Sequence, residues 1–169
     1  MGKIPVFVSC PTDLNKEQEK KRKKIVSILS ELNIDVRALG RSDYPKENPL
    51  KEVYVLAKHC AGGIILGFEQ TYVVSGRTKR GTSKEKYIDT PFSIPTSWNQ
   101  IEAGILFSLK LPLLIYKEVG VTGGIFDIGS SNLFVHEFPE GDINDNKLNE
   151  IKQVISSWYG DVNKVYYNY

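Results

Sequence analysis

The carboxylate of Glu102 is the side chain whose setting is best suited to chemistry. Trp98, Glu102 and Ile105 recur at i, i+4 and i+7, so a helix here would place a carboxylate on an otherwise apolar face. Ala103 and Gly104 remove side-chain bulk beside it, which would let a ligand or another backbone come close. One carboxylate in an aromatic, partly dry pocket can stabilise an oxocarbenium-like sugar or attack its anomeric carbon. The sequence therefore favours cleavage of an N-glycosidic bond.

The helix that carries Glu102 has its own start signals. Ser97 and Gln100 stand in the S-x-x-Q spacing of a capping box, and Pro95 stops a helix from running in before them. We expect the helix to begin between Thr96 and Trp98. A structural explanation for the carboxylate stays open, because glutamates in the first turns of helices commonly complement the helix dipole.

Other nucleophiles and metal ligands have weaker support. Cys10 follows a predicted strand, where an activated thiolate is one reading and a small buried cysteine the commoner one. Cys10 and Cys60 are too few for a disulfide framework or a structural zinc site, and His59 and His136 lack ligand spacing. We expect no metal and no cofactor.

Length and composition set the broad class. With 169 residues and 41% hydrophobic residues, we expect a single domain over 1–169. The formal charge of +2 gives no argument for nucleic acid or membrane, so we expect no membrane partner and do not expect nucleic acid as a partner. There is no apolar run of about 18 residues and no signal-peptide layout, so we expect a cytoplasmic protein.

The order of predicted elements indicates an α/β fold. Short apolar runs alternate with helical patterns, which is the signature of parallel crossovers. We therefore predict a flavodoxin-like, doubly wound parallel sheet of about five strands in a three-layer α/β/α arrangement. The predicted strands are Ile4–Ser9, Ile34–Leu39, Gly62–Gly67, Pro112–Tyr116 and Leu133–Phe138, and the predicted helices are Leu14–Leu32, Pro49–Cys60, the Glu102 helix and Lys147–Trp158.

Two segments interrupt this alternation. Residues 68–95 have little apolar period, so we expect a long inserted loop of the kind that forms lids or binding loops. Its five basic side chains could neutralise a phosphate or could simply be solvated. The glycine-rich stretch Gly120–Gly129 could approach a ligand by its backbone, although its spacing matches no phosphate-binding fingerprint.

We expect the aromatic tail Val165–Tyr169 to dock on the domain or on a second copy.

A ligand site follows from the predicted topology. In open parallel sheets, ligands bind beyond the carboxyl ends of the strands, where the strand order reverses. With the order 2-1-3-4-5, this crevice lies between strands one and three, at one end of the Glu102 helix. We expect substrate contacts from residues at this crevice and its flank: Ser9, Cys10, Thr12, Asp13, Arg41, Asp43, Gly67, Phe68, Trp98 and Asn99.

Three segments resemble Toll/interleukin-receptor (TIR) domains of the bacterial, enzymatic kind. Val6–Ser9 resembles the first box, Arg41–Pro45 the second loop, and Ser97–Glu102 the S-W-x-x-x-E segment that carries the catalytic glutamate. The resemblance implies that Glu102 cleaves the nicotinamide–ribose bond of NAD, with hydrolysis or cyclisation of the ADP-ribose. It also implies a role in bacterial antiviral signalling. NAD would then be a substrate and not a cofactor, and a homo-oligomer would be a further expectation.

The chain is also similar to nucleoside 2-deoxyribosyltransferase-like proteins. These share the flavodoxin-like fold and place a glutamate on the corresponding helix, and E-A-G-I at Glu102–Ile105 fits them about as well. The second resemblance implies a nucleoside deoxyribosyltransferase or a nucleoside-monophosphate N-glycosidase. A non-catalytic module that senses a nucleotide or self-assembles is a third alternative.

Overall fold

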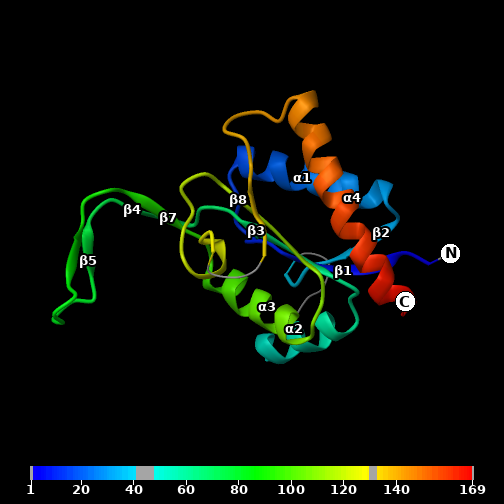
Figure 1. Cartoon of the computed structure of the whole chain (residues 1–169), viewed down its shortest axis with the longest axis horizontal. Helices are drawn as coiled ribbons and strands as arrows, with labels where there is room; N and C mark the ends of the chain where they lie inside the picture. The colour runs from blue at the N-terminus through cyan, green and yellow to red at the C-terminus, as the bar shows by residue number, and fades with distance from the viewer. Residues whose placement is uncertain (1, 41–47, 130–132, 169) are drawn as a thin grey trace.

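A five-stranded parallel sheet forms the centre of the protein. The computed structural model describes residues 2–40, 48–129 and 133–168. The strands are β1 (Ile4–Ser9), β2 (Ile34–Arg37), β3 (Gly63–Gly67), β8 (Leu113–Lys117) and β9 (Val135–Glu137). Their order is β2-β1-β3-β8-β9 and every pairing is parallel (Figure 1). The predicted flavodoxin-like order 2-1-3-4-5 is thus confirmed.

Two pairs of helices cover the two faces of this sheet. Helices α1 (Lys16–Glu31) and α4 (Asp145–Tyr167) lie on one face, and α2 (Pro49–Lys58) and α3 (Ser97–Ser108) lie on the other (Figure 1). Successive side chains of a strand point to opposite faces. In β3, Ile64 and Leu66 therefore pack toward α1 and α4, whereas Ile65 packs toward α2 and α3. The result is the predicted three-layer α/β/α arrangement.

Several element boundaries differ from the predictions. Helix α4 runs to Tyr167 and not to Trp158, so most of the aromatic tail forms its last turns. Tyr166 and Tyr167 are 38% and 41% exposed there. Strands β2 and β9 are shorter than predicted, ending at Arg37 and Glu137. The residues beyond these ends favour strands by their type but are not paired with a neighbouring strand. A strand stops where its hydrogen bonds to a neighbour stop, and not where its propensity changes.

The start of α3 differs in its capping. Thr96, and not Ser97, is the N-cap, and its hydroxyl oxygen accepts from the Trp98 amide. The side chain of Gln100 is used elsewhere. Its Nε2 donates to the Gly123 carbonyl at 2.9 Å, and its Oε1 accepts from the Ile125 amide at 3.1 Å. The predicted capping box is therefore wrong, because Gln100 joins α3 to the glycine-rich segment.

The predicted inserted loop is an ordered β-hairpin. Strand β4 (Thr71–Val73) pairs with β7 (Phe92–Ile94), and β5 (Gly76–Thr78) pairs with β6 (Lys86–Ile88), both antiparallel. Figure 1 shows this hairpin extending away from the three layers. The prediction of a loop is wrong because most of the hairpin is exposed and its buried residue, Ser93, is polar, so its strands carry no apolar alternation.

Candidate functional site

Glu102 lies in the first half of α3, on the side that faces the sheet. Its side chain is buried, with 8% of its surface exposed. Removal from water disfavours the charged form of a carboxyl group. This burial raises the pKa of Glu102 from its ordinary 4.5 to about 7, although a hydrogen bond from Ser9 acts in the opposite direction. A proton therefore moves on and off this carboxyl near neutral pH.

Ser9 and Asn99 form a short hydrogen-bonded chain behind this carboxyl. The Asn99 Nδ2 donates to the Ser9 Oγ at 2.8 Å. The single hydroxyl proton of Ser9 is then directed to Glu102, with which Ser9 is hydrogen-bonded. Asn99 is fully buried, and its Oδ1 has no hydrogen-bond partner among the described residues. The chain connects the end of β1 to α3 and holds the carboxylate in place.

A cavity of about 310 Å³ lies in front of Glu102. It sits beyond the carboxyl ends of β1, β2 and β3, so it adjoins the predicted crevice between the first and third strands and extends to the second. Backbone segments after β1, β2 and β3 and the first turns of α2 and α3 all contribute. The lining residues are Cys10, Pro11, Thr12, Leu39, Gly40, Pro49, Gln70, Thr96, Trp98 and Glu102.

Most of the predicted site residues meet at this cavity. Cys10, Thr12 and Trp98 line it with Glu102, while Ser9 and Asn99 lie behind the carboxyl. Asp13 is exposed nearby, and its carbonyl oxygen accepts from the Gln70 Nε2 at 3.1 Å. The predicted residues Arg41 and Asp43 fall outside the residues that the structure describes.

The structure does not bring Gly67 and Phe68 to the cavity. A Cβ atom at Gly67 would overlap the ring of Phe126, so this glycine serves close packing within the protein. Phe68 is fully buried and stacks on Phe138, with 5.4 Å between ring centroids. A glycine or an aromatic ring at the end of a strand can either pack in the core or contact a ligand. Gly67 and Phe68 both pack in the core.

Two further sequence features have structural explanations. The glycine-rich segment contains a short 3-10 helix, η1 (Gly124–Phe126), and Gly124 has a φ of 59° against the Gln100 side chain. It packs on the protein itself. Gly104 faces solvent, and no described atom lies within 4 Å of a Cβ added there. No other described segment of the backbone therefore packs closely against this glycine.

Gln70 also lines the cavity, although no pattern in the sequence predicts a site residue there. It follows β3 at the base of the hairpin, and its Nε2 donates to the carbonyl oxygens of Asp13 and Glu69. Both amide protons are thereby used, so the Oε1 remains as its acceptor. The periodicity of a helix or strand cannot identify such a residue. The position of Gln70 depends on how the segment after β3 meets the segment after β1.

A larger cavity of about 450 Å³ lies along α1, lined mainly by lysines such as Lys20 and Lys24. We favour the cavity at Glu102 as the functional site, because its wall contains a buried carboxyl group whose pKa is raised by burial to about 7. Within the described residues, no group of three or more His, Cys, Asp or Glu could hold a metal ion. No described helix has the length and apolar character needed to cross a membrane.

Comparisons with known proteins yield little. No family model matches the chain, and no curated protein matches it. Among solved structures, it is similar to the metal-soaked Flv1 flavodiiron core from Synechocystis sp. PCC6803, with 10% identity and a TM-score of 0.49. The match covers 96% of this chain and 36% of that chain, so this chain spans about a third of the length of that structure. A likeness at this level carries no argument about the site.

Proposed function

We propose that the protein cleaves an N-glycosidic bond of a nucleotide, with NAD as the favoured substrate and Glu102 as the catalytic residue. The observation that carries the proposal is a buried carboxyl with a pKa near neutrality at the wall of a cavity. Strongly shifted titratable groups that face a cavity are typical of active sites. The resemblance of Ser97–Glu102 to the TIR segment favours NAD.

The reaction that we propose breaks the bond between C1′ of the ribose and the nicotinamide nitrogen. The bonding electrons pass to the pyridinium nitrogen, so nicotinamide leaves as a neutral molecule and needs no proton. The ionised Glu102 stabilises the positive charge that develops at C1′, or attacks it and is displaced later. A water oxygen forms the new bond to C1′, and the proton that it loses passes to solvent.

The other residues at the cavity would position these groups. Ser9 donates to the carboxylate and Asn99 orients Ser9, which leaves the second oxygen of Glu102 for the sugar. The indole of Trp98 is 41% exposed at the cavity, where it could pack against a flat leaving base. Gln70 offers an acceptor oxygen for an amine or a hydroxyl group.

The size of the cavity favours a second candidate. A volume of about 310 Å³ is at the small end for ligand pockets, and one nucleoside would fill it. A nucleoside deoxyribosyltransferase or a nucleoside-monophosphate N-glycosidase would use the same carboxylate. In that case the leaving base must also gain a proton, and because ionised Glu102 acts on C1′, this proton comes from water in the cavity.

The test is release of a free base, measured by chromatography after incubation with NAD, deoxynucleosides and nucleoside monophosphates. We expect release from one of them, and a fall of at least about a hundredfold in Glu102→Gln, which keeps the shape and removes the charge. Glu140→Gln changes an exposed glutamate and is the matched control. If no base is released from any of these compounds, the enzymatic proposal is refuted. A ligand that binds without turnover would then favour the nucleotide-sensing module.

A further inference from the structure

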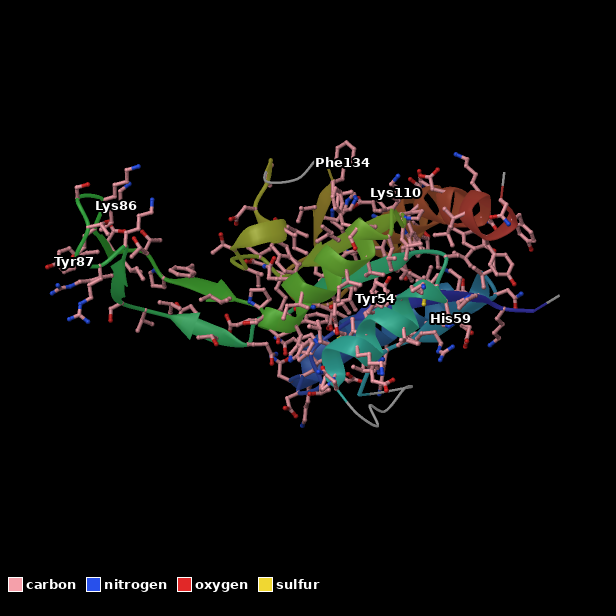
Figure 2. The ribbon with its side chains drawn as sticks, turned by 90° about the horizontal axis from the view of Figure 1, so that it is seen from below. Tyr54, His59, Lys86, Tyr87, Lys110 and Phe134 are labelled. Atoms are coloured by element: carbon pink, nitrogen blue, oxygen red, sulfur yellow. The ribbon has the colours of Figure 1, made fainter. Side chains whose placement is uncertain are left out.

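The hairpin of residues 70–94, here called the arm, is the least explained part of the molecule. Residues 74–84 are all exposed, and Figure 2 shows Lys86 and Tyr87 far from the sheet and helices. Isolated two-stranded hairpins are marginally stable in water. Its tip is held by its own contacts, such as the Arg77–Glu85 ion pair at 3.2 Å and the Gly81 amide that donates to Glu85 at 2.6 Å. Its base is joined to the domain, because the Ser93 amide donates to the Gly120 carbonyl and the Thr122 amide donates to the Ser93 carbonyl, both at 3.0 Å. The fold does not require it, which suggests a role of its own.

The arm holds the excess positive charge of the chain. Residues 71–94 contain five Lys and Arg and two Asp and Glu, whereas the remaining residues contain 17 basic and 18 acidic ones. The near-neutral charge of the whole chain therefore conceals a basic arm on a slightly acidic body. Such a separation of charge directs an anionic partner to the arm.

Most of these cations are free to meet a partner. Glu85 is engaged by Arg77, whose guanidinium also lies 4.8 Å from the centroid of the Tyr87 ring. The other basic side chains of the arm form no ion pair with any described residue; they are Lys79, Arg80, Lys84 and Lys86. Four unpaired cations on one narrow projection repel each other, and a row of phosphates would relieve that repulsion.

The composition of the arm favours nucleic acid over a protein or a membrane. The centres of protein interfaces are depleted of lysine, whereas the exposed tip of this arm consists mainly of Lys, Arg, Thr, Ser and Gly. Amphipathic segments on a membrane surface insert an apolar face into the lipid, and the tip has no such face. Tyr72 and Tyr87, 59% and 71% exposed, provide rings that can pack against sugars. A two-stranded ribbon also has the width that the major groove of B-form DNA admits.

We propose that the arm binds duplex DNA, with its tip in the major groove and its basic side chains on the phosphates. The contacts are to the backbone, so binding does not depend on base sequence. If all four unpaired cations reach phosphates, log Kd changes with log salt with a slope of about 3.6. Raising salt from about 50 to about 200 mM then weakens binding roughly 150-fold.

The test is fluorescence anisotropy of the full chain with a labelled duplex of about 20 base pairs, at several salt concentrations. The arm variant replaces Arg80, Lys84 and Lys86 by Gln. Its matched control replaces three lysines of the basic helix α1, Lys16, Lys23 and Lys24, so the net charge is the same in both. We expect the arm variant to lower the salt slope to about 1 and to weaken binding at least tenfold at low salt, and the control to bind like the unmodified chain.

Three results would overturn the proposal. One is no binding of the duplex by the unmodified chain at low salt. Another is an equal loss in both triple variants, which would mean that charge alone matters. The third is equal affinity for polyglutamate or for anionic lipid vesicles, which would assign the arm to another partner. Glu102→Gln should leave binding unchanged, so failure here and failure of the proposed catalysis are separate results.

Discussion

Burial of Glu102 makes a quantitative prediction about stability and pH. Below pH 4.5 the carboxyl is protonated in both the folded and the unfolded chain. Its burial then carries no free-energy cost for removing a charge from water. Between 4.5 and about 7 the unfolded chain releases this proton while the folded chain keeps it. The folded state therefore loses stability as the pH rises through this window. The difference in pKa corresponds to about 3 kcal/mol once both states are ionised.

Replacement of Glu102 by Gln removes this dependence, because an amide does not titrate. Relative to the unmodified chain, Glu102→Gln should gain about 1 kcal/mol near pH 5 and about 3 kcal/mol near pH 8, on top of a constant difference between the two side chains. The change with pH is the quantity to measure, since contributions of other titrating groups, such as His136, cancel in the comparison. Urea unfolding at a series of pH values gives it directly.

The control for this experiment is Glu140→Gln, in which the replaced glutamate is exposed. Its unfolding free energy relative to the unmodified chain should show no comparable change over the same range. If the Glu102→Gln difference also stays constant within about 0.5 kcal/mol from pH 5 to pH 8, Glu102 is hydrated in solution, and the argument from its burial is refuted.

Three other measurements test the site and its surroundings. If ionised Glu102 acts on NAD, nicotinamide release should rise with pH through about 7 and then level off, and a rate that falls over this range would contradict that role. Ser9→Ala should move this midpoint to higher pH, because it removes the hydrogen bond that favours the carboxylate, and an unmoved midpoint would count against the contact. Gly67→Ala should lower the free energy of unfolding by about 1–3 kcal/mol, because its Cβ overlaps the ring of Phe126. Gly104→Ala, on an exposed helix face, should raise it by up to about 1 kcal/mol, and equal effects of both substitutions would contradict this packing.

The sheet could be predicted from the sequence because its strands are buried on both faces. Runs such as Ile64–Leu66 are continuously apolar, and the helices between them impose parallel crossovers. The helical spacing also predicts that Glu102 shares an apolar face with Trp98 and Ile105. The buried side of α3 is instead formed by Asn99, Glu102, Ala103 and Leu106, and Trp98 is 41% exposed. Both inferences rest on residues whose neighbours are close in sequence.

The remaining features depend on contacts between distant segments. The spacing of Gln100 from Ser97 indicates a helix cap. In the structure the Gln100 side chain instead forms hydrogen bonds with the backbone of Gly123 and Ile125, 23 and 25 residues away. Asn99 was expected to contact substrate, and the structure shows it supporting Ser9, 90 residues away. The arm shows no apolar period because residues 74–84 are all exposed and the buried residue at its base, Ser93, is polar. A single sequence shows side-chain types and spacings, whereas the partner of each polar atom is set by the folded chain.

The way the arm leaves the domain has a consequence for how such a protein can vary. Its two ends meet where the Gln70 amide donates to the Ile94 carbonyl at 3.0 Å, so the chain departs and returns at neighbouring points. The exposed tip, residues 74–84, could be lengthened, shortened or exchanged while β3 still leads into α3. The base could not, because Ser93 is buried and its backbone is hydrogen-bonded to Gly120 and Thr122. Gln70 and Thr96, on either side of the junction, both line the cavity. The domain that holds the cavity and the exposed tip of the arm can therefore change independently, and the two parts are free to diverge at different rates.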